Sequence, residues 1–198
     1  MMDLTEAGLV RVARRFYPTG YPITTDDHSQ ELHPYQRTPE YARWREAWNR
    51  AMVWPEWKTL IREMHRSFPE SGDCTQPRAA ACRRCCVYLE RSLPNGARHL
   101  TCVATAASVL APLYVTYCTT EIVVDKHSQE KRLFLELPEE VKPHAAKLSG
   151  FVERILGYQA FPLQFANVPV PEIRTHHTFG KEPTLLDALF DSHLDSHF

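Results

Sequence analysis

The cysteines are the residues of this sequence with the clearest capacity for chemistry. The chain has six cysteines in 198 residues, and Cys82 and Cys85 form a C-x2-C pair, with Cys74 upstream and Cys86 adjacent. Such a pair supplies half of a zinc site, which needs four ligands, and no second C-x2-C pair follows it. We therefore interpret the cysteines as free, mostly buried thiols of a reducing compartment, and we expect no bound metal and no cofactor.

Acidic residues form the second candidate site, in two separate groups. The C-terminal sequence repeats Asp-Ser-His, so a helix there would stack three carboxylates at i, i+4 and i+8, namely Asp187, Asp191 and Asp195. With His193 and His197 this row could bind a divalent ion, but fraying at a chain terminus favours a solvated face or an acidic docking surface. The second group consists of three nearby glutamates: Glu136, Glu139 and Glu140. We predict that both groups belong to a partner-binding surface.

Sequence signatures of catalysis are missing. The chain has no G-x-S-x-G, no P-loop, no G-x-G-x-x-G and no H-E-x-x-H, and its seven glycines leave little material for a phosphate-binding loop. A net charge of −1 gives no global attraction to nucleic acid. No run of 18 apolar residues is present, and the N-terminus does not resemble a secretory signal. We expect a cytoplasmic protein that binds neither nucleic acid nor membrane and is not an enzyme.

The N-terminal half is expected to be helical. Thr38 and Pro39 are a suitable N-cap and first residue for a helix with a tryptophan-rich face, and Pro55 starts another helix directly after Trp54. So short a link predicts a helical hairpin or a sharply kinked pair. We predict a further long helix at about 139–156, ended by Gly157, and a short last helix in which Thr184 and Asp187 form a capping box.

The middle of the chain is expected to form strands. Strand-like segments lie at 85–89, 99–106, 113–124 and 132–137, with a turn at 93–96, a hairpin loop at 125–130 and an edge strand within 158–173. Leu133, Leu135 and Leu137 alternate, so we expect one apolar face that packs against the helix at 139–156. The order of elements predicts an α+β fold: a mostly antiparallel sheet packed by the N-terminal helical hairpin and the long helix. We expect one domain over 1–198, with 17–37 as a wrapping loop or mobile arm.

Several segments together resemble a known class of proteins. They are WREAWNRAMVWPEW at 44–57, SVLAPLYVTY at 108–117, VPVPEI at 168–173 and TLLDALF at 184–190. In general layout the chain resembles small cytosolic immunity proteins of bacterial polymorphic toxin systems. The resemblance implies a stoichiometric inhibitor that binds a cognate protein toxin and occludes its active site. It carries no site residues over to this chain.

Two other functions stay open at this point. One is a small cytosolic hydrolase with an unrecognised Cys–His or metal site, which a bound metal or a deep cleft with adjacent Cys and His would favour. The other is a structural or oligomeric interaction protein, which a large exposed apolar patch would favour.

Overall fold

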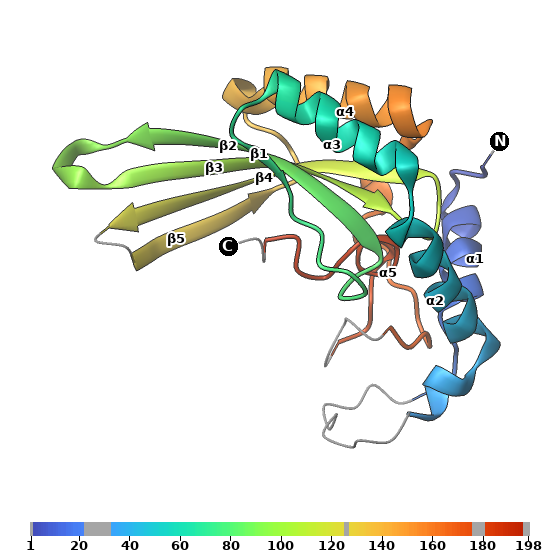
Figure 1. The fold of residues 1–198 in the computed structure, drawn as a ribbon. Helices are drawn as coiled ribbons and strands as arrows, with labels where there is room; N and C mark the ends of the chain where they lie inside the picture. Colours follow the sequence, from blue (N-terminus) through green and yellow to red (C-terminus); the bar gives the residue numbers. More distant parts are fainter. Residues whose placement is uncertain (1, 22–32, 125–126, 176–180, 196–198) are drawn as a thin grey trace.

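An antiparallel sheet with helices against it organises the chain (Figure 1). The computed structural model describes residues 2–21, 33–124, 127–175 and 181–195. The helices are α1 (Glu6–Phe16), α2 (Pro39–Met52), α3 (Pro55–Ser67), α4 (Lys142–Leu156) and α5 (Leu185–Leu189). The strands are β1 (Ser71–Asp73), β2 (Cys82–Ser92), β3 (Arg98–Ser108), β4 (Leu113–Val124), β5 (His127–Phe134) and β6 (Gln159–Ala160). The fold is therefore α+β, as the sequence predicts.

Several predicted helix boundaries are confirmed by their caps, whereas α4 begins at Lys142, after a 3-10 turn at Glu139–Val141. The Thr38 hydroxyl accepts a hydrogen bond from the Tyr41 N–H at 3.3 Å, and Pro39 is the first residue of α2. Gly157 ends α4 in the left-handed conformation (φ 69°), which a residue without Cβ adopts at little cost. In α5 the predicted capping box is present, because Thr184 and Asp187 each accept a backbone hydrogen bond from the other.

The sheet is a meander. Its order is β1-β2-β3-β4-β5, every neighbouring pair is antiparallel, and β6 adds a short parallel pairing to the start of β4. The turn at 93–96 and the long strand at 113–124 are as predicted. The segment 158–173 forms β6, a 3-10 turn at Leu163–Phe165, and isolated antiparallel bridges from Pro169 to Thr184 and from Ile173 to Thr19.

The fourth predicted strand is displaced from its expected position. β5 begins at His127 and ends at Phe134, so the expected loop at 125–130 shrinks to 125–126, which lie outside the described residues. Phe134 is paired with Cys118 and packs with Val141 and Ala145 beside α4. Leu133 therefore points to the opposite face and is 40% exposed, so the prediction that Leu133, Leu135 and Leu137 share one helix-facing surface was wrong.

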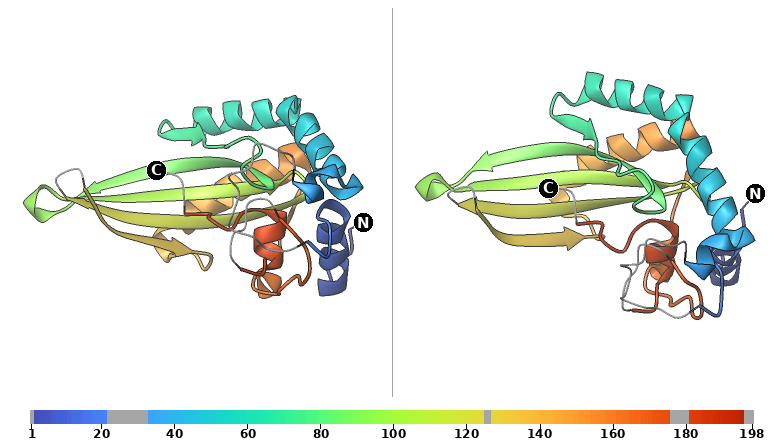
Figure 2. Two further views of the ribbon diagram at one scale, coloured as in Figure 1. Left: turned by 90° about the horizontal axis from the view of Figure 1, so that it is seen from below. Right: turned by 60° about the horizontal axis from the view of Figure 1, so that its bottom comes forward.

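The helices divide between the two faces of the sheet. α3 and α4 lie side by side on one face, where Trp57, Leu60, Leu148 and Val152 form one core cluster with Cys85 and other sheet residues (Figures 1 and 2). α1, α5 and the C-terminal segment lie at the other face, near one end of the sheet. The far ends of the β2–β3 and β4–β5 hairpins extend beyond the helices.

The two N-terminal helices joined at Pro55 form a kinked pair rather than an antiparallel hairpin. α2 packs on α1, whereas α3 packs on α4, so the chain changes direction at Trp54 and Pro55 (Figure 2). Of the predicted arm at 17–37, residues 22–32 lie outside the described residues. At its two ends Tyr17 and Tyr35 are buried, and the Tyr17 hydroxyl donates a hydrogen bond to the Ala188 carbonyl at 2.8 Å. In the part of the chain that the structure describes, no helix is long and apolar enough to cross a membrane.

Candidate functional site

The C-terminal aspartates do not form the predicted row. α5 ends at Leu189, so the spacing i, i+4, i+8 never falls on one helix face. Asp187 is 5% exposed, and its carboxylate accepts the Thr184 N–H at 2.9 Å and lies 3.4 Å from the Lys181 ammonium. Asp195 alone is exposed. His197 lies outside the described residues, so the structure does not place a metal-binding pair with His193.

Asp191 has a structural position that the sequence did not suggest. Its carboxylate forms an ion pair with the guanidinium of Arg84 on β2, and both side chains are almost completely buried. Its second oxygen accepts the N–H of His193 at 3.0 Å, so the same residue also shapes the backbone that follows. Asp187 and Asp191 are therefore buried, and neither contributes a carboxylate to an accessible surface.

The second acidic group is accessible. Glu136, Glu139 and Glu140 are all exposed on the segment that connects β5 to α4, and only Glu139 has an ion pair there, with Lys142. Beside Glu140 the surface is hollowed, with a volume of about 240 Å³, between this segment and the free ends of β2 and β3. The hollow is lined by Leu89, Glu90, Arg91, His99, Thr101, Glu140 and Val141.

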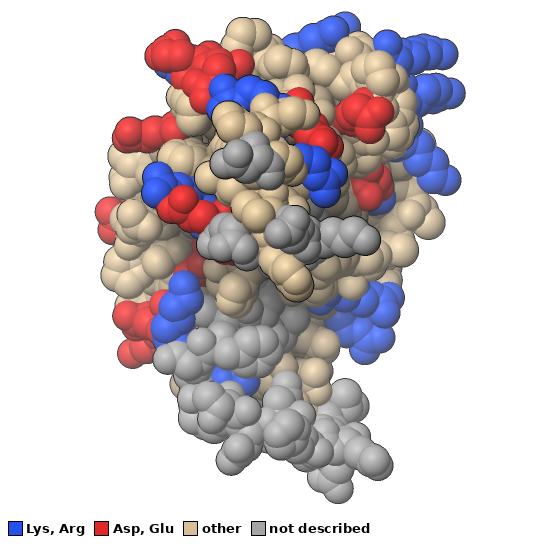
Figure 3. All heavy atoms as spheres, turned by 90° about the vertical axis from the view of Figure 1, so that its left-hand side faces the viewer, with Lys and Arg blue, Asp and Glu red and all other residues tan. Residues whose placement is uncertain are grey.

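The charges on one face of the molecule are unevenly distributed, with some mixing of the two signs. The net charge is −1. Viewed toward the free hairpin ends, lysine and arginine side chains gather along one edge, and most aspartate and glutamate side chains lie toward the other (Figure 3). An uneven distribution of this kind can favour the approach of a charged partner from one side.

The C-x2-C pair does not converge on one point. Cys82 and Cys85 are three residues apart on β2, and the period of two therefore places them on opposite faces. Cys82 packs in the cluster under α1 and α5, whereas Cys85 packs under α3 and α4. Among the described residues, no group of three or more His, Cys, Asp or Glu is arranged to hold a metal ion.

The thiols lie in environments that oppose ionisation. Burial raises the pKa of Cys82 to about 12 and that of Cys118 to about 11, and it also raises the pKa of Cys85. A hydrogen bond with Cys86, followed by burial, raises the pKa of both Cys74 and Cys102. A nucleophilic cysteine needs a lowered pKa, so these five thiols are poor nucleophiles at neutral pH.

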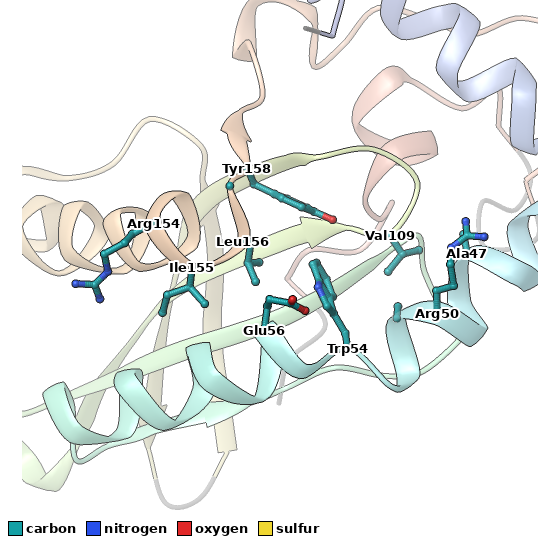
Figure 4. Close-up of a pocket in the computed structure, with 11 residues that line it drawn as sticks. Ala47, Arg50, Trp54, Glu56, Val109, Arg154, Ile155, Leu156 and Tyr158 are labelled. Atoms are coloured by element: carbon teal, nitrogen blue, oxygen red, sulfur yellow. The ribbon is translucent and has the colours of Figure 1, made fainter.

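A larger cavity lies where sequence analysis predicted nothing. Its volume is about 620 Å³, within the range of small-molecule sites, and it opens between the α2–α3 junction and the end of α4 (Figure 4). The lining residues are Ala47, Arg50, Ala51, Trp54, Glu56, Val109, Arg154, Ile155, Leu156, Gly157 and Tyr158. The signals that place it are Pro55, which turns the chain after Trp54, and Gly157, which ends α4 immediately before Tyr158.

Trp54 and Tyr158 form an aromatic wall of this cavity, and neighbouring residues fix the position of both rings. The rings of Trp54 and Tyr158 are 5.4 Å apart, and Trp54 stacks on Trp57 at 5.9 Å. The Arg83 guanidinium lies 4.8 Å from the Trp57 ring, and Asp73 accepts hydrogen bonds from both residues at 2.9 Å. The Tyr158 hydroxyl donates to the Ser108 carbonyl at 3.2 Å, which ties the other ring to β3. The two rings of the aromatic wall are therefore held in position before any ligand binds.

Comparison with known proteins yields no relative. No family model, no curated protein and no solved structure matches this chain.

Proposed function

We propose that this chain is a cytoplasmic immunity protein of a bacterial toxin system, which binds a cognate protein toxin and blocks its active site. The proposal rests on the exposed acidic segment at Glu136, Glu139 and Glu140, beside hairpin ends that no described helix covers. An inhibitor of this kind requires a stable scaffold with an accessible, charged surface, and it requires no catalytic group.

The properties of the thiols favour binding over the alternative of a cysteine hydrolase. Burial keeps the Cys82 and Cys85 thiols protonated, and each points into a packed cluster. A covalent mechanism would need a thiolate in an accessible, electropositive environment. The buried Arg84 near Cys82 is itself paired with Asp191, so its charge is already balanced.

The contact surface that we propose is narrower than the sequence indicated. Because Asp187 and Asp191 are buried, the accessible carboxylates are those of Glu136, Glu139 and Glu140, with Asp195 as a separate exposed charge. Carboxylates on such a surface would steer a basic toxin toward it, which speeds association more than it strengthens the final complex.

Rescue of toxin-expressing cells tests the proposal. The protein is expressed with each candidate toxin domain found to be encoded beside its gene, and survival is compared between the wild-type chain and Glu136→Lys/Glu139→Lys/Glu140→Lys. A matched control carries the same change of charge elsewhere, as Glu6→Lys/Glu63→Lys/Glu182→Lys. We expect rescue by the wild type and the control and weaker rescue by the first variant. Equal rescue by both variants would remove the acidic segment from the interface, and no rescue by the wild type would reject the function.

A further inference from the structure

We propose that the cavity between the α2–α3 junction and α4 is a binding site for an organic cation, an alkylammonium or guanidinium group with an apolar stem. The observation that carries this inference is the combination of an aromatic wall with a carboxylate that has no hydrogen-bond or ion-pair partner among the described residues. The site is distinct from the acidic segment, so it does not depend on the proposed immunity function.

Glu56 supplies the negative charge. Its carboxylate turns toward the space between α3 and the end of α4, beside Trp54 and Leu156 (Figure 4). No hydrogen bond or ion pair joins it to any other described residue. By contrast, Glu40, Glu46 and Glu63 on the same two helices each form an ion pair with an arginine three or four residues away.

The two arginines at the cavity are already engaged. The Arg50 guanidinium is 2.7 Å from the Glu46 carboxylate, and the Arg154 guanidinium lies over the Phe151 ring at 5.3 Å. In Figure 4 the Arg154 side chain extends along α4 and away from Trp54 and Glu56. Because a cation–π contact does not neutralise a charge, Arg154 keeps its positive charge, and the charge nearest to Trp54 and Leu156 is the exposed carboxylate of Glu56.

The C-terminal ends of α2 and α4 favour a cation at the cavity, whereas the N-terminal end of α3, which has Glu56 in its first turn, carries partial positive charge. α2 and α4 both end beside the cavity, and the last carbonyls of a helix carry partial negative charge that attracts cations. After the Gly157 N–H binds the Glu153 carbonyl at 3.0 Å, the later carbonyls of α4 have no partner within the helix. The rings of Trp54 and Tyr158 pack on each other, and a cation that reached an open face of either ring would also gain cation–π attraction.

The apolar lining determines the rest of the ligand. Val109, Ile155 and Leu156 line the cavity together with Ala47 and Ala51. A bare inorganic cation would gain nothing from these side chains, whereas an alkyl stem of several carbons would bury its surface against them. The ligand class is therefore an amine or guanidine with an apolar stem, either as a free molecule or as a lysine or arginine side chain of another protein.

Titration followed by NMR tests the site. The indole N–H signals of the four tryptophans are recorded on ¹⁵N-labelled protein, and Trp54→Phe identifies the signal of Trp54. The probes are n-butylammonium, n-butylguanidinium, the neutral n-butanol, the anion butyrate, and a short lysine-containing peptide. We expect saturable shifts of the Trp54 signal with the cationic probes and weaker shifts with butanol and butyrate.

Variants separate the cation site from nonspecific binding. Glu56→Gln should weaken binding of n-butylammonium about three- to tenfold, because it removes the charge and keeps the shape. Glu63→Gln removes a charge from the same helix away from the cavity lining, and it should leave binding unchanged.

The two sources of the cation give different results. Saturation by the free cations supports a small-molecule ligand, and saturation by the lysine peptide alone supports a basic side chain of a partner. The proposal is overturned if butyrate binds as well as n-butylammonium, if Glu56→Gln has no effect, or if none of the cationic probes saturates.

Discussion

The carboxylate of Asp191 forms a buried ion pair with the guanidinium of Arg84, and this pair joins the C-terminal segment to the second strand of the sheet. The two residues are 107 positions apart in the sequence. A buried charge that loses its partner is strongly destabilising. The pair is therefore a structural anchor for the residues that follow α5.

Neutralising Asp191 should unfold the protein at much lower denaturant concentration. Asp191→Asn leaves a buried guanidinium without its counter-charge, and we expect a loss of about 3–5 kcal/mol in the free energy of unfolding. Asp195→Asn removes an exposed carboxylate nearby, and we expect a change within about 0.5 kcal/mol. Urea denaturation followed by circular dichroism measures both. Similar midpoints for the two variants would show that the pair does not anchor the segment.

Alanine substitutions at Gly150, within α4, and at Gly157, its C-cap, should change the stability of the protein in opposite directions. Gly157 has φ 69°, so Gly157→Ala forces an alanine into the left-handed region, and we expect a loss of about 1–2 kcal/mol. Gly150 lies within the helix, and a Cβ added there meets nothing within 4 Å. Gly150→Ala should therefore stabilise the protein by about 0.5–1 kcal/mol. Thermal unfolding of the two variants measures both effects. A shift of Tm in the same direction for both variants would contradict this assignment of the helix end.

The buried thiols should make stability fall at alkaline pH. Burial raises the pKa of Cys82 from 9.0 to about 12, so above pH 9 the unfolded chain loses this proton while the folded chain keeps it. Folding is then opposed by about 1.4 kcal/mol per pH unit between pH 9 and 12 for this thiol, and the effect is absent below pH 9. Cys82→Ala should reduce the slope of unfolding free energy against pH in that window. Parallel profiles for wild type and variant would show that Cys82 ionises normally in the folded protein.

The purified protein should contain no stoichiometric zinc. Cys82 and Cys85 point to opposite faces of the sheet, so one ion cannot bind both without a change of backbone. Elemental analysis after purification without chelators is the measurement. About one equivalent of zinc, lost in Cys82→Ser/Cys85→Ser, would contradict the prediction.

Local signals in the sequence predicted most of the elements. Thr38 with Pro39, the capping box at Thr184 and the terminating Gly157 each act within a few residues of their own position, and all are confirmed. The strand at 113–124 could also be predicted from local sequence, because β-branched and aromatic residues fill it.

The predictions from sequence were wrong where the structure depends on strand register or on contacts between residues far apart in the chain. Alternation at Leu133 gives the spacing of a strand and does not say which of its two faces is buried; the pairing of Phe134 with Cys118 settles that. The burial of Asp191 depends on Arg84, which no local pattern connects to it. The cavity at Trp54 and Tyr158 depends on the packing of α3 against α4, so no short motif could predict it.

Direct binding to a candidate toxin, one that rescue of toxin-expressing cells identifies, tests the central claim. The purified chain and the toxin are mixed, and affinity, stoichiometry and toxin activity are measured in the same samples. The proposed function predicts a one-to-one complex with Kd on the order of nanomolar or tighter, with toxin activity lost in proportion to the bound fraction. A toxin that stays fully active with the protein at micromolar concentration, and forms no complex with it, would contradict the claim.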